Sequence, residues 1–188
     1  METKDRILDC AMAELERSGI DNFSLRAVGT AAGLTPMAVY RHYRDRDALL
    51  AAVGEAAFAA WQQAISGIDA KQPLAWLRAA GRAYAAFALD QPAQFEACFV
   101  IRTKVERLYP EDFRAGRSPV IGAVVEKIVA AESRGDLRDG DPLELALFFW
   151  AELHGLVMLH RSGRFTLKRR AFLALVDRAL DRMLQARD

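Results

Sequence analysis

Hydrophobic residues recur at helical spacing along the whole chain, and no segment shows the two-residue alternation of a half-buried strand. Short segments rich in Gly, Pro, Ser, Thr and Asp separate the apolar stretches and supply helix start and stop signals. The pattern predicts an all-α protein of about nine helices. The expected ranges are 3–18, 25–32, 35–43, 46–66, 73–89, a helix that begins at Pro92, 119–133, 141–162 and 166–186, with a loop over 109–119.

Residues 25–50 carry the most specific local pattern in the chain. The helix over 25–32 has one apolar face and is followed by Gly33, which suits the left-handed conformation that often ends a helix. Thr35 is a good N-cap for the next helix, whose inward stripe is Val39 and Tyr43. Two short helices joined by a tight glycine-containing turn predict a helix-turn-helix, whose second helix can lie in the major groove of DNA.

The outward face of this second helix carries small, aromatic and hydrogen-bond-donating side chains. Met37, Ala38, Tyr40, Arg41 and His42 fall on the side away from the apolar stripe. Groups of these kinds can reach base edges and phosphates. The face therefore favours double-stranded DNA as a partner, and the alternative is an ordinary solvated helix face.

The segment from Ala32 to Leu50 resembles the DNA-binding domain of the TetR family of transcriptional regulators, and the likeness extends upstream to the first helix. Tyr43 stands where the family usually has Phe, Arg46 where it has Lys, and Met37 where many members have Gly. The residues that match the family pattern are Ala32, Gly33, Leu34, Thr35, Val39, Tyr40, His42, Tyr43, Arg46, Leu49 and Leu50.

The resemblance implies a helix-turn-helix domain over residues 1–50, linked through the helix over 46–66 to a helical effector-binding and dimerisation domain over 51–188. It also implies a one-component repressor that binds a palindromic operator as a homodimer and is released by a small-molecule effector. The expected DNA-binding residues are Ser24, Arg26, Thr35, Pro36, Met37, Ala38, Tyr40, Arg41, His42 and Arg46.

Two strings in the C-terminal part, residues 83–99 and 150–165, resemble the ligand-binding domain of a TetR subgroup named for a Trp-His-Gly signature. Trp150, His154 and Gly155 stand where that signature places them. The resemblance implies a sensor and dimerisation module and leaves the effector unspecified. The alternative interpretation of His154 is a packed or hydrogen-bonded histidine at a close approach of two helices.

The same region has more large apolar side chains than a single helix seam needs, which predicts a pocket for a small apolar or aromatic effector. Aromatic residues at helical spacing are also typical of a filled helical core, and that alternative stays open. The candidate pocket residues are Trp61, Trp76, Tyr84, Phe87, Phe95, Phe99, Arg102, Phe148, Phe149, Glu152 and Met158.

The last two helices carry apolar stripes that are too broad to be left in water on terminal helices. Pairing both helices with those of a second copy predicts a four-helix dimer interface. The expected interface residues are Leu153, Leu156, Phe172, Val176, Ala179, Leu180 and Met183.

The composition limits how and where the protein acts. The chain has 188 residues, of which 52% are hydrophobic, and a net charge of only +1, so we expect a local DNA contact rather than a basic surface. Cys10 and Cys98 have no paired spacing and are expected to be buried thiols in a reducing compartment. No signal peptide is recognised, and Glu55, Glu144 and Glu152 interrupt the longest apolar stretches, so a cytoplasmic protein without a membrane segment is expected.

An enzyme is the rival function class. The three histidines and two cysteines show no metal-ligand spacing, and no glycine-rich phosphate loop or nucleophile motif is present. We therefore predict no catalytic residue, metal or cofactor. A helical scaffold without DNA contact would account for the amphipathic helices but not for Tyr40, Arg41 and His42.

Overall fold

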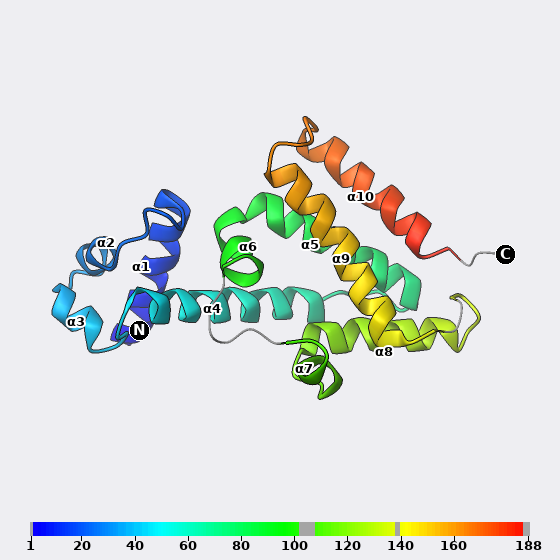
Figure 1. Cartoon of the computed structure of the whole chain (residues 1–188), viewed down its shortest axis with the longest axis horizontal. Helices are drawn as coiled ribbons and strands as arrows, with labels where there is room; N and C mark the ends of the chain where they lie inside the picture. Colours follow the sequence, from blue (N-terminus) through cyan, green and yellow to red (C-terminus); the bar gives the residue numbers. More distant parts are fainter. Residues whose placement is uncertain (1, 102–107, 138–139, 186–188) are drawn as a thin grey trace. The chain divides into compact units, whose positions relative to one another are not determined.

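The computed structural model describes residues 2–101, 108–137 and 140–185, and within these ranges the chain is helical and contains no strand (Figure 1). The predicted all-α fold is therefore confirmed. The helices are α1 (Thr3–Ser18), α2 (Leu25–Ala31), α3 (Pro36–Tyr40), α4 (Arg46–Ser66), α5 (Pro73–Asp90), α6 (Pro92–Phe99), α7 (Glu111–Arg114), α8 (Pro119–Glu132), α9 (Pro142–Arg161) and α10 (Arg169–Met183).

The described part holds one helix more than the nine predicted, because α7 lies in the expected 109–119 loop. Asp112 stabilises this single turn: its carboxylate accepts hydrogen bonds from the Leu108 backbone N–H at 2.6 Å and from Arg117 Nε at 2.7 Å. A turn held by polar contacts of one side chain has no apolar stripe, so the hydrophobic pattern of the sequence does not predict α7. The last helix also begins later than predicted, with Lys168 and not Thr166 as its N-cap.

The chain divides into two compact units. The N-terminal unit comprises Met1–Trp61 and Gln91–Glu106, and the C-terminal unit comprises Gln62–Asp90 and Arg107–Asp188. The N-terminal unit therefore holds most of α4 and the whole of α6, in addition to α1–α3. The division of function at residue 50 stays a prediction, since compactness alone does not assign a role to either part.

The core of the N-terminal unit is built by α1–α4 together with α6. Helix α1 packs against both α2 and α6, and α6 places Ala97 in the same cluster as the helix-turn-helix residues. A contribution from α6 was not expected, because its partners lie far away in sequence. The fully enclosed members of this core are Ile7, Ala11, Leu15, Phe23, Val28, Ala32, Val39, Tyr43, Leu49, Leu50, Val53 and Ala97.

The core of the C-terminal unit forms around α5, which packs against α8, α9 and α10. Gly81 of α5 permits the closest approach, because a Cβ there would lie 2.6 Å from Leu180 Cδ2 and 3.1 Å from Leu153 Cδ1. Ion pairs also run between α5 and α10, with Arg78 Nε 3.0 Å from Asp181 Oδ1. Pairs as exposed as this one add little stability, so their main effect is to favour one antiparallel register.

The apolar stripe of α10 packs within the chain, and the expected dimer interface stays a prediction. Phe172, Val176 and Leu180 are buried, as is Leu153 of α9, because they face α5 and its neighbours rather than water. The remaining expected interface residues, Leu156, Ala179 and Met183, are half-buried.

Two helices are long and apolar enough to cross a membrane by length and composition, namely α4 and α9. The expectation that acidic residues interrupt both stretches too early for a span is therefore wrong on these criteria. In α4 the apolar residues Leu49, Leu50 and Val53 are buried in the core of the N-terminal unit, as in the core helix of a globular protein. The absence of a membrane segment stays a prediction.

We expect Gly54→Ala to destabilise the N-terminal unit. A Cβ at Gly54 would lie 2.8 Å from the backbone oxygen of Ala97, which cannot move without moving α6. Overpacking of this kind costs about 1–3 kcal/mol, which outweighs the gain of about 1 kcal/mol from replacing a helical glycine. Urea denaturation measures the net change.

The matched control is Gly122→Ala in α8, where a Cβ meets no atom within 4 Å. This variant is expected to gain up to about 1 kcal/mol, since only the helix propensity changes. Equal stabilisation of both variants would contradict the close packing of α4 on α6.

Candidate DNA-binding site

The helix-turn-helix is held by caps and by a close helix crossing. Ser24 Oγ accepts a hydrogen bond from the Ala27 N–H at 3.4 Å, and Thr35 Oγ1 accepts one from the Ala38 N–H at 3.3 Å. Both residues are the N-caps of their helices. Gly29 lies at the crossing, where a Cβ would be 3.2 Å from Val39 Cγ2. A larger residue at this position would push α3 away from α2.

The turn between α2 and α3 has the predicted glycine geometry. Gly33 has a φ of +66°, and the Leu34 N–H donates to the Gly29 carbonyl at 2.8 Å. This hydrogen bond closes the C-terminal end of α2 in the manner of a Schellman motif. The turn therefore fixes where Thr35 begins α3.

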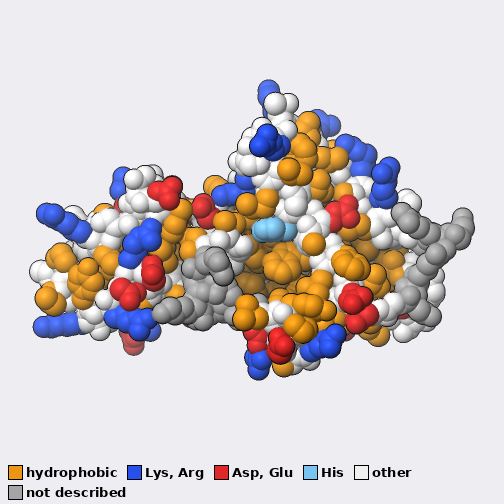
Figure 2. All heavy atoms as spheres, in the orientation of Figure 1, with side chains coloured by type: hydrophobic (Ala, Val, Ile, Leu, Met, Phe, Trp, Pro, Cys, Tyr) orange, Lys and Arg blue, Asp and Glu red, His pale blue; other side chains and the backbone are white. Residues whose placement is uncertain are grey.

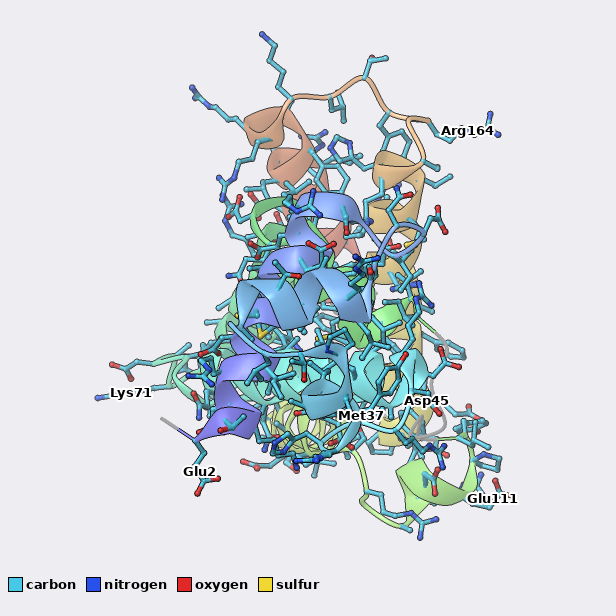
Figure 3. All side chains as sticks on the ribbon, turned by 90° about the vertical axis from the view of Figure 1, so that its left-hand side faces the viewer. Glu2, Met37, Asp45, Lys71, Glu111 and Arg164 are labelled. Atoms are coloured by element: carbon cyan, nitrogen blue, oxygen red, sulfur yellow. The ribbon has the colours of Figure 1, made fainter. Side chains whose placement is uncertain are left out.

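One face of α3 is anchored and the other is open to solvent. Val39 and Tyr43 are 0% and 5% exposed, whereas Met37 and Tyr40 are 67% and 47% exposed. Figure 3 looks onto this end of the N-terminal unit, with Met37 labelled on α3. Arg41 and His42 are exposed as well, Thr35 and Pro36 lie exposed at the start of the helix, and Ala38 is half-buried.

Met37 and Tyr40 are two large side chains exposed next to the cation of Arg41. The arrangement offers side chains that can enter a groove and contact base edges. The exposed residues are ones that the sequence predicted to contact DNA, whereas Val39 and Tyr43 are buried and inaccessible to a ligand. On the face drawn in Figure 2, charged side chains of both signs lie over the N-terminal unit.

Arg46 has a structural role that sequence reasoning missed. Its guanidinium donates to the Phe23 carbonyl, with Nε 3.3 Å from the oxygen, and to the carbonyl of Ile20. It also lies over the Phe23 ring, 5.9 Å from the centroid. Arg46 therefore ties the start of α4 to the connection between α1 and α2. A phosphate contact by Arg46 stays a prediction.

Ser24 and Arg26 lie on the α2 side of the same unit. Ser24 is half-buried and its oxygen is engaged as the N-cap acceptor, while Arg26 is exposed. A phosphate contact by either residue stays a prediction.

The candidate effector-pocket residues are distributed over both units. Trp61, Phe95 and Phe99 belong to the N-terminal unit, while Arg102 lies outside the described residues. Phe148 and Glu152 are exposed, which differs from the expected lining of an enclosed pocket, because both lie on the solvent side of α9. The other residues of the C-terminal unit are buried or half-buried: Trp76, Tyr84, Phe87, Phe149 and Met158.

A hydrogen-bonded aromatic cluster joins α5 to α9. Trp150 Nε1 donates to Tyr84 Oη at 3.2 Å, and Tyr84 Oη lies 2.8 Å from His154 Nδ1. Phe113 of α7 stacks on Trp150 with ring centroids 6.5 Å apart. His154 is thus hydrogen-bonded within the helix packing, which was one of the two interpretations of this residue.

The polarity of this cluster favours a neutral His154. Because Trp150 Nε1 can only donate, the Tyr84 hydroxyl accepts from it and can donate its own hydrogen to an unprotonated His154 Nδ1. Burial also lowers the pKa of His154 from its ordinary value of 6.5. Both effects disfavour the charged ring.

We therefore expect stability to fall as the pH drops below about 6.5. The pKa of His154 in the folded state is lowered, so the unfolded chain binds more protons in the interval between the two pKa values. Stability is fully present above the unfolded pKa and is lost as the pH falls toward the folded one. Thermal unfolding between pH 7.5 and 5 measures the slope, and His154→Gln should flatten it. An unchanged slope in that variant would assign the effect to other groups.

The described residues contain no group of three or more His, Cys, Asp and Glu side chains that could hold a metal ion. Cys10 and Cys98 are both free and half-buried. Burial raises the pKa of the Cys98 thiol to about 12, which keeps it protonated and a poor nucleophile at neutral pH.

A helix-turn-helix whose second helix has one exposed face, joined to a separate all-helical unit, is the arrangement of a helix-turn-helix DNA-binding protein with a second domain. Two family models match the chain. One, described as bacterial regulatory proteins of the tetR family, matches residues 7–53, and the other, described as a Tetracyclin repressor-like C-terminal domain, matches residues 77–185. The chain belongs to the TetR family. The second description does not name the Trp-His-Gly subgroup, which stays a prediction.

Several solved structures share this fold over nearly the whole chain. A protein of unknown function from Rhodococcus sp. RHA1 is 26% identical, with a TM-score of 0.81 and coverage of 100% of this chain and 97% of that one. The putative regulatory protein SCO4313 is also 26% identical, with a TM-score of 0.68 and coverage of 96% and 94%.

AibR in complex with isovaleryl coenzyme A and operator DNA is 18% identical, with a TM-score of 0.69 and coverage of 97% and 98%. At this identity the likeness concerns the fold alone. No curated protein sequence matches the chain.

Proposed function

We propose that this protein is a one-component repressor that binds a palindromic operator as a homodimer and is released by a small-molecule effector. The observation that carries the DNA-binding part is the exposed face of α3, where Tyr40 and Arg41 stand opposite the buried Val39 and Tyr43. In this arrangement α3 enters the major groove and α2 braces it against the backbone. Membership of the TetR family supports the same role.

A homodimer gives the protein two such helices, related by a two-fold axis. The two half-sites of the operator then lie about one helical turn apart, roughly 34–36 Å, or a multiple of it. The dimer face that we propose is the solvent side of α9, where Phe148 is 63% and Leu159 is 45% exposed. Leu156, Ala179 and Met183, which are half-buried, are proposed to contribute to it. A second copy is the occupant that would cover two large apolar side chains on one helix.

An effector in the C-terminal unit is proposed to favour a conformation in which the two α3 helices no longer match the operator. We expect a small apolar or aromatic molecule, because the candidate positions there are mainly aromatic. AibR, which has the same fold, has been solved with an acyl coenzyme A and operator DNA together, so the fold is compatible with both kinds of ligand.

A helical scaffold without effector binding is the second candidate, and an enzyme is the third. Two observations favour the scaffold: packing within the chain accounts for the α10 stripe, and it also accounts for the Tyr84–His154 contact. No catalytic residue, metal or cofactor is proposed, and the place of action is the cytoplasm, where operator DNA lies.

The proposal is tested by selecting duplexes from a random pool with the full-length protein and measuring their affinity against salt. We expect enrichment of a palindrome and a binding constant that falls steeply with salt concentration. Small molecules that raise the melting temperature are then titrated with and without the selected duplex. A true effector that weakens DNA binding must bind the DNA complex more weakly by the same factor.

A protein that enriches no sequence would contradict the regulator function. Stabilising compounds that bind equally well with and without DNA would instead leave a DNA-binding protein without a sensor.

A further inference from the structure

An open depression lies on the N-terminal unit beside the helix-turn-helix, lined by residues of α1, α2 and the α2 N-cap. Its polar side chains are two arginines, two hydroxyls and a single carboxylate. Neither of the α1 members of this set belongs to the DNA-binding residues expected from the sequence. The lining residues are Glu14, Arg17, Ser24, Arg26, Ala27, Thr30 and Ala31.

Glu14 is unusual because its side chain is only 7% exposed. A buried carboxylate is costly unless it is paired, and here the partner is Arg17. Arg17 Nε donates to Oε2 at 3.0 Å, and Nη2 lies 2.8 Å from both carboxylate oxygens. This two-pronged contact fixes the plane of the guanidinium.

Arg17 nevertheless remains 68% exposed. Glu14 engages the edge formed by Nε and Nη2, so the N–H groups of Nη1 point away from the carboxylate. Within the described residues, Nη1 has no hydrogen-bond partner. The pair therefore presents a cation in a fixed orientation to the solvent side of the depression.

The surroundings of Arg17 favour an anion. Arg26 is a second exposed cation in the same lining, so the two arginines outnumber the one carboxylate. Ser24 uses its oxygen as the acceptor for the Ala27 N–H, which leaves its hydroxyl proton available for donation. An anion bound here would meet two guanidinium groups and a hydroxyl.

We propose that this depression receives a phosphate of the DNA backbone and that Arg17, held by the buried Glu14, is the additional phosphate-contacting residue. The inference rests on the proposed DNA-binding function. The depression is lined in part by α2, the helix that crosses the phosphate backbone when the second helix of the motif occupies the major groove. Contacts of this kind fix the register of the protein on the duplex without reading its sequence.

The test compares wild-type protein with a double variant, Glu14→Gln with Arg17→Gln, and with Arg17→Gln alone. The double variant removes one negative and one positive charge, so the net charge and the pairing of buried groups are preserved. Its control is Arg134→Gln with Asp136→Asn, which removes an ion pair of 2.9 Å from the C-terminal unit. The probes are a duplex selected by the wild-type protein and a random-sequence duplex of equal length.

Loss of one phosphate contact in each protomer lowers the salt slope of a dimer by about two. Between 50 and 200 mM salt, the ratio of wild-type to double-variant affinity is then expected to fall about tenfold, on both duplexes. The control pair should keep the wild-type slope. A purely structural role for the Glu14–Arg17 pair would lower the melting temperature of the single variant and leave the slope of the folded double variant unchanged.

The outcomes separate this inference from the proposed function. If wild-type protein binds with a steep salt dependence and the double variant has the same slope, Arg17 does not contact phosphate although the protein binds DNA. If the wild-type protein shows no salt-sensitive binding to either duplex, the proposed DNA-binding function itself is wrong.

Discussion

Replacing Arg41 with Ala is expected to weaken binding to the selected operator by about 1–3 kcal/mol for each half-site. A dimer has two half-sites, so the affinity falls by about 30-fold even at the lower limit. The reason is that Arg41 lies exposed at the C-cap of α3, beside the exposed Tyr40, where its guanidinium can reach a base edge. Titration of wild-type and variant protein with the operator and with a scrambled duplex measures the change.

The matched control for Arg41 is Arg44→Ala, which removes a cation that is 75% exposed and lies 3.1 Å from Asp45. Loss of this charge should weaken binding to both duplexes by a similar, smaller factor, because a non-specific contact does not discriminate sequences. Equal losses on both duplexes for Arg41→Ala would show that Arg41 contacts the backbone and not a base.

The DNA-binding part of the fold could be predicted in detail because its signals are local. The caps of Ser24 and Thr35 act on residues three positions ahead, and Gly33 adopts the left-handed conformation that its place after the helix predicts. Each of these features depends on a short stretch of chain and on the chemistry of a single residue type. The order of such residues was therefore sufficient to place α2, the turn and the start of α3, whereas α3 ends at Tyr40, three residues before the predicted end.

The partners of side chains far apart in sequence could not be predicted in the same way. Arg46 donates to the carbonyl of Ile20, 26 residues earlier, and Tyr84 lies beside His154, 70 residues later. Nothing in the sequence around Arg46 or His154 indicates which distant residue each of them contacts. The sequence indicated which residues lie on each helix. The partners of their side chains depend on how the helices pack against one another.

The same limit applies to the dimer interface, which stays a prediction. The apolar stripe of α10 was recognised, but periodicity does not say whether a stripe meets its own chain or a second copy. Gly81 decides this in the structure, because the absence of a side chain allows Leu180 and Leu153 to approach α5. For this reason the dimer face that we propose is the solvent side of α9, where Phe148 and Leu159 are exposed.

Substitution of Leu180 with Asp is therefore expected to unfold the C-terminal unit rather than merely separate the protomers. Leu180 is 1% exposed, so the variant loses a buried apolar side chain and places an unpaired carboxylate in the core. The combined cost is about 5 kcal/mol or more, which is comparable to the whole stability of a domain. Loss of helicity by circular dichroism is the measurement.

Phe148→Asp is the variant to compare with Leu180→Asp. Phe148 is 63% exposed in the single chain, so its replacement leaves the core intact. This variant should retain full helicity but scatter light as a monomer and lose affinity for the full palindrome, since the two α3 helices are then no longer linked. A dimer of unchanged stability would exclude this side of α9 as the interface. If the Leu180→Asp variant is instead folded and monomeric, Leu180 is not a core residue of the unit, because a charge in the core would unfold it. The dimer interface would then include α10.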